Sequence, residues 1–305
     1  MFGKQNVIHD STKTRNPPAC RVVASRGALR AAVAAARSAG RSIGFVPTMG
    51  ALHAGHLSLA DAAREECDFV VVSIFVNPTQ FGPGEDFERY PRQLEADVAL
   101  LASRGVELVF APQPDEVYRP GATTMVDVSG VAEPLEGCFR PGHFRGVATV
   151  VLKLLNLVTP DVAFFGQKDY QQSLVVRRLV DDFDLPVKIR VCPTVREPDG
   201  LALSSRNAYL APDDRRRALV LSRGLILACE LFASGQRDAS VIKRHMSELL
   251  AVDPAVKIDY LTLADSETLA EVTEATPHTV ALVAARVAGV RLIDNCFLWQ
   301  PPGAR

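Results

Sequence analysis

The sequence predicts an α/β protein in which a Rossmann-like, doubly wound parallel sheet is followed by a smaller C-terminal α+β domain. Strand-like apolar runs alternate with helix-like segments up to about residue 191, which is typical of a parallel sheet covered by helices on both faces. Beyond about residue 194, two helical segments precede three strand-like runs, which indicates a change of architecture. The chain has 305 residues, more than one hydrophobic core usually organises, so we expect two domains.

The expected strands of the first sheet are short runs rich in Val, Ile, Leu and Phe, as is typical of strands buried on both faces. They lie at residues 43–46, 69–76, 106–110, 162–165 and 187–191. The expected helices lie at residues 28–39, 57–66, 94–103, 144–158 and 171–183, with one further turn at 115–117. Because crossovers between parallel strands are right-handed, the loops that follow these strands should meet along one edge of the sheet.

The C-terminal part has the pattern of a separate, smaller unit. Helices are expected at residues 213–234 and 241–250, and strands of an antiparallel sheet at 256–264, 279–284 and 290–297. We therefore divide the chain into three parts. These are a flexible polar extension at 1–19, a Rossmann-like nucleotide-binding catalytic domain at 20–194 and a C-terminal domain at 195–305.

Composition argues against several classes of partner. Lys and Arg number 34 and Asp and Glu 35, so the chain offers no overall attraction to nucleic acid. No apolar run approaches the ~18 residues that a membrane helix needs, and residues 1–18 contain no hydrophobic signal segment. The six cysteines lack Cys-x-x-Cys or zinc-finger spacing and are expected to be buried thiols in a reducing compartment. We expect a cytoplasmic protein with no nucleic-acid or membrane partner.

The strongest local motif is the segment 47–56, Pro-Thr-Met-Gly-Ala-Leu-His-Ala-Gly-His, which lies where a strand gives way to a helix. The first N–H groups of a helix are unpaired and its macrodipole is positive there, so both stabilise a phosphate. Gly55 has no Cβ and permits close approach to the backbone. His53 and His56 lie about one turn apart and can face one phosphate. The segment therefore predicts an ATP-phosphate site.

Two other interpretations of this segment are open. Both histidines could be ordinary surface or helix-capping residues. A metal site is the other, but no carboxylate or third ligand stands nearby in the sequence.

Two further polar segments follow strands and should reach the same edge. Lys168, in Gly166–Asp169, is well placed to neutralise triphosphate charge, although a solvated lysine is the simpler interpretation. Residues 203–207, Leu-Ser-Ser-Arg-Asn, combine hydroxyls with a guanidinium and suit phosphate oxygens, but could equally form a helix-capping turn.

Glutamine side chains provide a possible site for an uncharged substrate. Gln80 follows a long buried strand, and Gln171 and Gln172 begin a helix. Their neutral amides could hydrogen-bond a hydroxylated substrate, although exposed glutamines are usually only solvated.

Together these segments resemble the pantothenate synthetase family, also called pantoate–β-alanine ligases, of the HxGH-type nucleotidyltransferase superfamily. The matching stretches lie in the same order at residues 47–56, 74–82, 135–149, 165–172 and 196–207. The resemblance implies a Rossmann-like domain, a C-terminal domain acting as a lid, and a homodimer. It also implies a reaction in which ATP, (R)-pantoate and β-alanine give pantothenate, AMP and diphosphate through a pantoyl adenylate, with Mg²⁺.

The resemblance also assigns residues, none of them a ligand of the metal ion. We expect catalytic roles for His53, His56, Lys168 and Arg206, of which His56 corresponds to the family's proton donor. Gln80 and Gln172 would bind pantoate, and Gln80 would also contact β-alanine. ATP would be bound by Met49, Gly50, Ala51, Leu52, His53, Ala54, Gly55, His56, Gly166, Gln167, Lys168, Asp169, Val195, Leu203, Ser204, Ser205 and Arg206.

The sequence departs from the family pattern at two positions. Ala54 stands where Glu is usual, and Leu203 where Met is usual. Neither change removes one of the cationic or hydrogen-bonding groups expected to contact the phosphates. Leu is nearly isosteric with Met, so the second change is conservative. Two rival functions are retained. One is a nucleotidylyltransferase acting on a phosphorylated acceptor, which would need further basic residues, and the other is a non-catalytic nucleotide-binding module.

Overall fold

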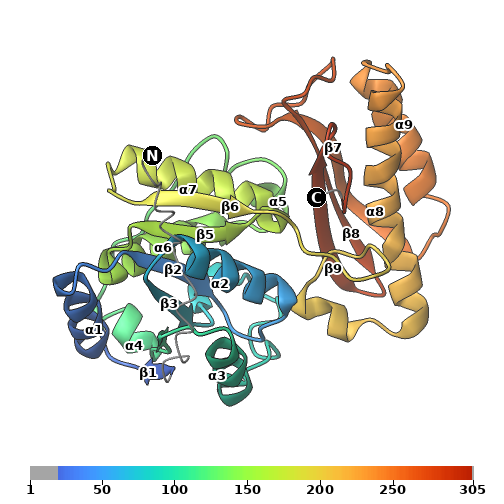
Figure 1. Ribbon diagram of the computed structural model, residues 1–305. Coiled ribbons are helices and arrows are strands. Elements are labelled where there is room, and N and C mark those ends of the chain that lie inside the picture. The colour runs from blue at the N-terminus through green and yellow to red at the C-terminus, as the bar shows by residue number, and fades with distance from the viewer. Residues whose placement is uncertain (1–19, 304–305) are drawn as a thin grey trace, which may run out of the picture.

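The computed structural model describes residues 20–303, so the extension expected at 1–19 lies outside the described residues. The predicted fold class is confirmed. A six-stranded parallel sheet covered by helices lies beside a smaller unit in which two helices pack on a three-stranded antiparallel sheet (Figure 1). None of the helices between residues 20 and 303 is long and apolar enough to cross a membrane.

The parallel sheet has the strand order β1-β4-β3-β2-β5-β6. The order reverses between β2 and β5, and ligands of such sheets bind where this reversal occurs, beyond the carboxyl ends of the strands. Strand β1 was not predicted, because it has only three residues and two of them are exposed. The strands are β1 (Arg21–Val23), β2 (Ile43–Thr48), β3 (Phe69–Ile74), β4 (Leu108–Phe110), β5 (Val162–Gly166) and β6 (Lys188–Cys192).

Each face of this sheet has its own apolar core. Phe45 packs into a core with residues of α1, α6 and α7, whereas the next residue, Val46, packs on the other side with residues of α2. This alternation follows from the two-residue period of a strand. The helices are α1 (Arg26–Ser38), α2 (Ala54–Glu66), α3 (Leu94–Ser103), α4 (Pro114–Val117), α5 (Glu136–Phe139), α6 (His143–Val158) and α7 (Tyr170–Asp182).

The C-terminal unit is the predicted α+β domain. Helices α8 (Pro212–Ala233) and α9 (Ala239–Leu250) share one apolar core with a face of its sheet. That sheet consists of β7 (Val256–Asp265), β8 (Thr279–Val287) and β9 (Val290–Phe297), all antiparallel.

Polar and apolar contacts join the two units. Leu282 of β8 packs with Tyr170 and Leu174 of α7. Arg291 of β9 donates to both oxygens of Glu136, at 2.6 and 2.7 Å, and this carboxylate is buried. Breaking such a buried pair leaves an uncompensated charge, so it fixes the relative position of α5 and β9.

Close packing also places the segment after β3. Gly146 of α6 lies against η1 (Pro78–Gln80), and a Cβ added to it would be 2.2 Å from the carbonyl oxygen of Thr79. Asn77 is buried beside it and donates its Nδ2 to the carbonyl oxygen of Gly146 at 3.2 Å. The absence of a side chain at residue 146 therefore sets the position of Gln80.

We expect Gly146→Ala to lower the free energy of unfolding by about 1–3 kcal/mol, because the methyl group overlaps backbone that cannot move without disturbing α6. Chemical denaturation measures this. The control is Gly27→Ala in α1, where an added Cβ meets nothing within 4 Å. Equal stabilities for the two variants would contradict the packing argument.

Candidate active site

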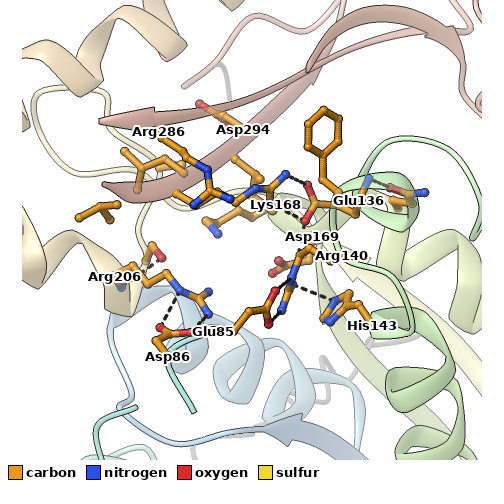
Figure 2. A pocket seen from close by; sticks show the side chains of 18 of the residues that line it. Glu85, Asp86, Glu136, Arg140, His143, Lys168, Asp169, Arg206, Arg286 and Asp294 are labelled. Atoms are coloured by element: carbon orange, nitrogen blue, oxygen red, sulfur yellow. Dashed lines mark hydrogen bonds and ion pairs between the residues drawn. The ribbon is translucent and has the colours of Figure 1, made fainter. Parts of the chain in front are cut away.

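Two adjoining cavities lie at the carboxyl ends of β2 and β5. The smaller, of about 220 Å³, is lined by the segments that follow β2, β3 and β5. The larger, of about 910 Å³, lies between the two units (Figure 2). Lys168, Asp169, Gln172, Ser204 and Arg206 line both cavities, so the two form one continuous site.

Most residues predicted for the site line the smaller cavity. These are Met49, His53, Gly55, His56, Gln80, Gly166, Lys168, Asp169, Gln172, Val195, Leu203, Ser204, Ser205 and Arg206. Five residues predicted to contact ATP line neither cavity, and they are Gly50, Ala51, Leu52, Ala54 and Gln167.

The two histidines cap the helix that follows them. His53 is the N-cap of α2 and its Nδ1 accepts from the backbone N–H of Gly55 at 3.2 Å. The Nδ1 of His56 accepts in turn from the N–H of His53, at 3.4 Å. In a neutral imidazole one nitrogen accepts and the other donates, so both rings carry their proton on Nε2. The capping interpretation and the ATP-site interpretation are therefore compatible, because capping leaves both Nε2–H groups as donors.

Both imidazoles are neutral at neutral pH in this structure. Burial, and after it the neighbouring His53 and Lys168, lower the pKa of His56 to about 3. Burial and then the charge of Lys168 lower the pKa of His53 to about 4. The expectation that cations stabilise phosphate charge therefore applies to Lys168, whereas the histidines offer neutral N–H dipoles.

Gly55 is required for a reason in addition to the predicted close approach of a ligand. A Cβ at this position would lie 2.9 Å from Cε1 of His53. The missing side chain thus makes room for the His53 ring to fold back as a cap.

Asp97, which the sequence analysis missed, holds the segment between β2 and α2. It is fully buried in α3, and its carboxylate accepts from the N–H groups of Ala51 and Leu52 at 2.9 and 2.8 Å. Gly50 and Ala51 have left-handed backbone conformations, with φ of 83° and 51°. These amides therefore turn toward Asp97 instead of the cavity, which explains why Gly50 to Leu52 do not line it.

A hydrogen-bond chain orients Gln80. The hydroxyl of Tyr118 donates to Oδ1 of Asn77 at 2.8 Å, and Nδ2 of Asn77 donates to Oε1 of Gln80 at 3.1 Å. The Gln80 amide nitrogen is consequently turned toward Met49 and the cavity. Gln80 is thus a placed donor and not merely a solvated side chain.

Arg140 and His143 support Gln80 from the other side. Nη1 of Arg140 donates to Nε2 of His143 at 3.1 Å, so Nδ1 carries the proton and donates to the carbonyl oxygen of Gln80 at 2.8 Å. Arg140 also donates to both oxygens of Glu85, each at 2.7 Å (Figure 2).

The two adjacent glutamines of α7 have different roles. Gln172 lines both cavities. Gln171 is buried, and its amide nitrogen donates to the carbonyl oxygens of Val131 and Pro134 at 2.8 and 2.7 Å. The suggestion that Gln171 offers its amide to a substrate is therefore wrong, since the amide is used to hold the segment before α5.

Ser204 and Arg206 also serve the local fold. Ser204 caps η3 (Ser205–Tyr209) by accepting from the N–H of Arg206 at 3.3 Å. The Arg206 guanidinium forms a bidentate pair with Asp86 across the cavity, at 2.9 and 3.0 Å (Figure 2). Burial alone would raise the pKa of Asp86, but this pairing lowers it below its ordinary value. Asp86 thus compensates the charge of Arg206.

The described part of the chain contains no group of three or more His, Cys, Asp or Glu side chains arranged to hold a metal ion.

The fold and the site together define a Rossmann-like α/β protein of the class that commonly binds nucleotides, with neutral imidazole donors at a helix N-terminus facing a lysine that has no ion-pair partner among the described residues. A family model described as pantoate–β-alanine ligase matches residues 21–297. The chain belongs to this family.

Relatives agree along nearly the whole chain. Pantothenate synthetase of Moorella thermoacetica is 55% identical over 271 residues, which cover 89% of this chain and 96% of that protein. The crystal structure of pantothenate synthetase from Thermus thermophilus matches with a TM-score of 0.87 and 48% identity, covering 92% of this chain and 99% of that one. A pantoate–β-alanine ligase from Francisella tularensis, solved with β-γ ATP and β-alanine, matches with a TM-score of 0.76 and 35% identity, covering 93% and 100%.

Buried neutral histidines should make stability depend on pH. Burial and then the charge of Arg140 lower the pKa of His143 to about 4, whereas an unfolded histidine titrates near 6.5. The unfolded chain therefore binds a proton first, so stability falls as the pH is lowered from about 6.5 to about 4. In His143→Gln we expect unfolding in this window to take up about one proton fewer.

Denaturation across a pH series measures this slope. The control is His278→Gln, which removes an exposed histidine outside both cavities and tests whether the loss of any histidine changes the slope. An unchanged slope in His143→Gln would show that His143 titrates normally in the folded protein.

Proposed function

We propose that this protein condenses pantoate with β-alanine, using ATP to form an enzyme-bound pantoyl adenylate. The observation that carries the proposal is the family match over residues 21–297, combined with a cavity that brings the histidine loop, the glutamines and Lys168 together. The relative from Francisella tularensis, crystallised with β-γ ATP and β-alanine, supports ATP as the nucleotide.

In the first step a carboxylate oxygen of pantoate attacks the α-phosphorus of ATP, and the bond to the leaving diphosphate breaks. A carboxylate is already ionised at neutral pH, so this step needs no general base. The barrier comes mainly from charge on the phosphoryl oxygens. Lys168, the Nε2–H groups of His53 and His56, and the N-terminus of α2 are placed to stabilise that charge.

In the second step the amine of β-alanine attacks the pantoyl carbonyl carbon, a C–N bond forms and AMP leaves. The adenylate must be kept from water between the steps. We propose that residues 195–305 act as a lid, with Ser204 to Arg206 closing over ATP. The Arg206–Asp86 pair supports this, because it already joins the two sides of the cavity.

The charges of the smaller cavity favour a hydroxy acid, whose single charge is its carboxylate, over a phosphorylated acceptor. Its lining contains the cations Arg140, Lys168 and Arg206. Glu85 pairs with Arg140 and Asp86 with Arg206, so among the described residues that line the smaller cavity only Lys168 is left for the triphosphate. A nucleotidylyltransferase would need a further cation for the acceptor phosphate, whereas the amides of Gln80 and Gln172 suit the hydroxyls of pantoate.

Mg²⁺ fits this site as a companion of the nucleotide. Mg²⁺ in such sites is held largely by phosphate oxygens with one or two carboxylates. Asp169 lines both cavities, and within residues 20–303 its carboxylate has no hydrogen-bond or ion-pair partner, so it would supply the protein ligand. When bound, the ion would neutralise triphosphate charge.

We further propose that the protein is cytoplasmic and forms a homodimer. The boundary between the catalytic domain and the C-terminal domain of each chain is proposed to lie between residues 194 and 195. The six cysteines support a reducing compartment, since all of them are unpaired thiols. The homodimer is supported by the family resemblance alone.

The proposed function is tested by exchange of labelled diphosphate into ATP. We expect exchange that depends on pantoate and Mg²⁺ and does not need β-alanine. Folded protein that exchanges only with a phosphorylated acceptor would favour the nucleotidylyltransferase. Nucleotide binding without exchange would favour the non-catalytic module.

Lys168→Ala should lower the exchange rate at least about 100-fold, because it removes the unpaired cation that faces the phosphates. Its thermal unfolding should change little, since the Lys168 ammonium has no ion-pair partner among the described residues. Lys257→Ala, an exposed lysine on β7 outside both cavities, is the matched control for exchange. A large loss of stability in Lys168→Ala would assign Lys168 a structural role instead.

A further inference from the structure

Lys168 is held by its backbone and not by its side chain. It belongs to the single turn η2 (Gln167–Asp169), whose N-cap, Gly166, has no side chain to offer. In the described part of the chain, the Lys168 ammonium makes no hydrogen bond or ion pair. The position of the cation in the cavity therefore depends on what holds this turn.

One side chain of the C-terminal unit holds it. Asn295, on β9, is 2% exposed, and its Nδ2 donates to the carbonyl oxygens of Gln167 and Lys168 at 3.0 and 2.9 Å. Its Oδ1 accepts from Nε2 of Gln167 at 3.4 Å. Both amide hydrogens are used on the turn, and residues 20–303 provide no other side-chain hydrogen bond to these two carbonyl oxygens.

Asn295 is itself fixed by its neighbour in the chain. Its N–H donates to Oδ1 of Asp294 at 2.8 Å. Asp294 forms a buried bidentate pair with Arg196, at 2.7 and 2.8 Å, and Arg196 also donates to the carbonyl oxygen of Gly200 at 3.1 Å. Consecutive residues of β9 thus reach the lysine turn and the segment that leads to Arg206.

We propose that Asn295 is a positioning residue for Lys168, so that β9 is needed for adenylate formation itself and not only for covering the site. The proposal rests on the proposed function in one respect, namely that Lys168 acts on the triphosphate. Asn295 also lines the larger cavity, but in the proposed role it acts through the turn and not by contact with a substrate.

A double-mutant cycle separates this role from a general structural one. In Asn295→Ala we expect the rate of pantoate-dependent diphosphate exchange to fall about 10- to 100-fold, the scale expected for a misplaced catalytic group. In the Lys168→Ala background the same substitution should have almost no further effect. Equal fold-changes in the two backgrounds would overturn the proposal.

Two further variants guard the experiment. Thr262→Val on β7 is the matched control. Thr262 is also buried, it lies outside both cavities, and the substitution removes its one side-chain hydrogen bond, to Glu271. It should leave exchange unchanged. Asn295→Asp keeps the shape of the side chain but places a carboxylate oxygen against the carbonyl oxygens of Gln167 and Lys168, which cannot donate to it. It should show the same loss of exchange, and it replaces Asn295→Ala if that variant does not fold.

The same cycle measured on the affinity for a non-hydrolysable ATP analogue does not depend on the acceptor. If the unaltered protein shows no exchange, the proposed function fails, and the cycle on affinity still decides the role of Asn295. Coupling between Asn295 and Lys168 in affinity would support the positioning role. Additive losses of affinity would reject it.

Discussion

The unpaired N–H groups at the start of α2 set the chemistry of this site. His53 and His56 accept two backbone N–H groups, and this fixes the proton of each ring on Nε2. Burial then keeps both rings neutral. The same contacts that begin the helix therefore produce two neutral donors beside its positive end, so helix capping and phosphate recognition cannot be separated in this segment.

The loop that delivers these histidines depends on a buried carboxylate. Asp97 accepts the amides of Ala51 and Leu52, which leaves little freedom in the turn between β2 and α2. A Cβ at Gly50 would meet Oδ2 of Asp97 at 2.9 Å. The glycine and the left-handed turn are thus needed to make room for Asp97. The backbone amides of Ala51 and Leu52 are used by Asp97 and are not available to a phosphate.

The sequence predicted the two sheets, most of the helices and the cavity-lining motifs, because each of these depends on a local pattern. The His53–His56 motif can be found in the sequence because its two histidines are only three positions apart. The residues that the sequence-based prediction missed contact segments that are far away in the chain. Asp97 acts on residues 45 and 46 positions away, and Asn295 on residues 127 and 128 positions away. Neither has a local signature, since a single buried Asp or Asn resembles any polar residue in an apolar segment.

On the proposed function, the distribution of charge explains how one site can accommodate both a triphosphate and a singly charged hydroxy acid. In the smaller cavity, acidic partners compensate Arg140 and Arg206 and the histidines are neutral, so Lys168 is the uncompensated cation among the described residues that line it. A second uncompensated cation would also attract phosphorylated metabolites. Discrimination against them is then achieved by pairing the arginines with Glu85 and Asp86. On the proposed function, Arg206 contributes only after it exchanges Asp86 for a phosphate oxygen, which links its use to the presence of the nucleotide.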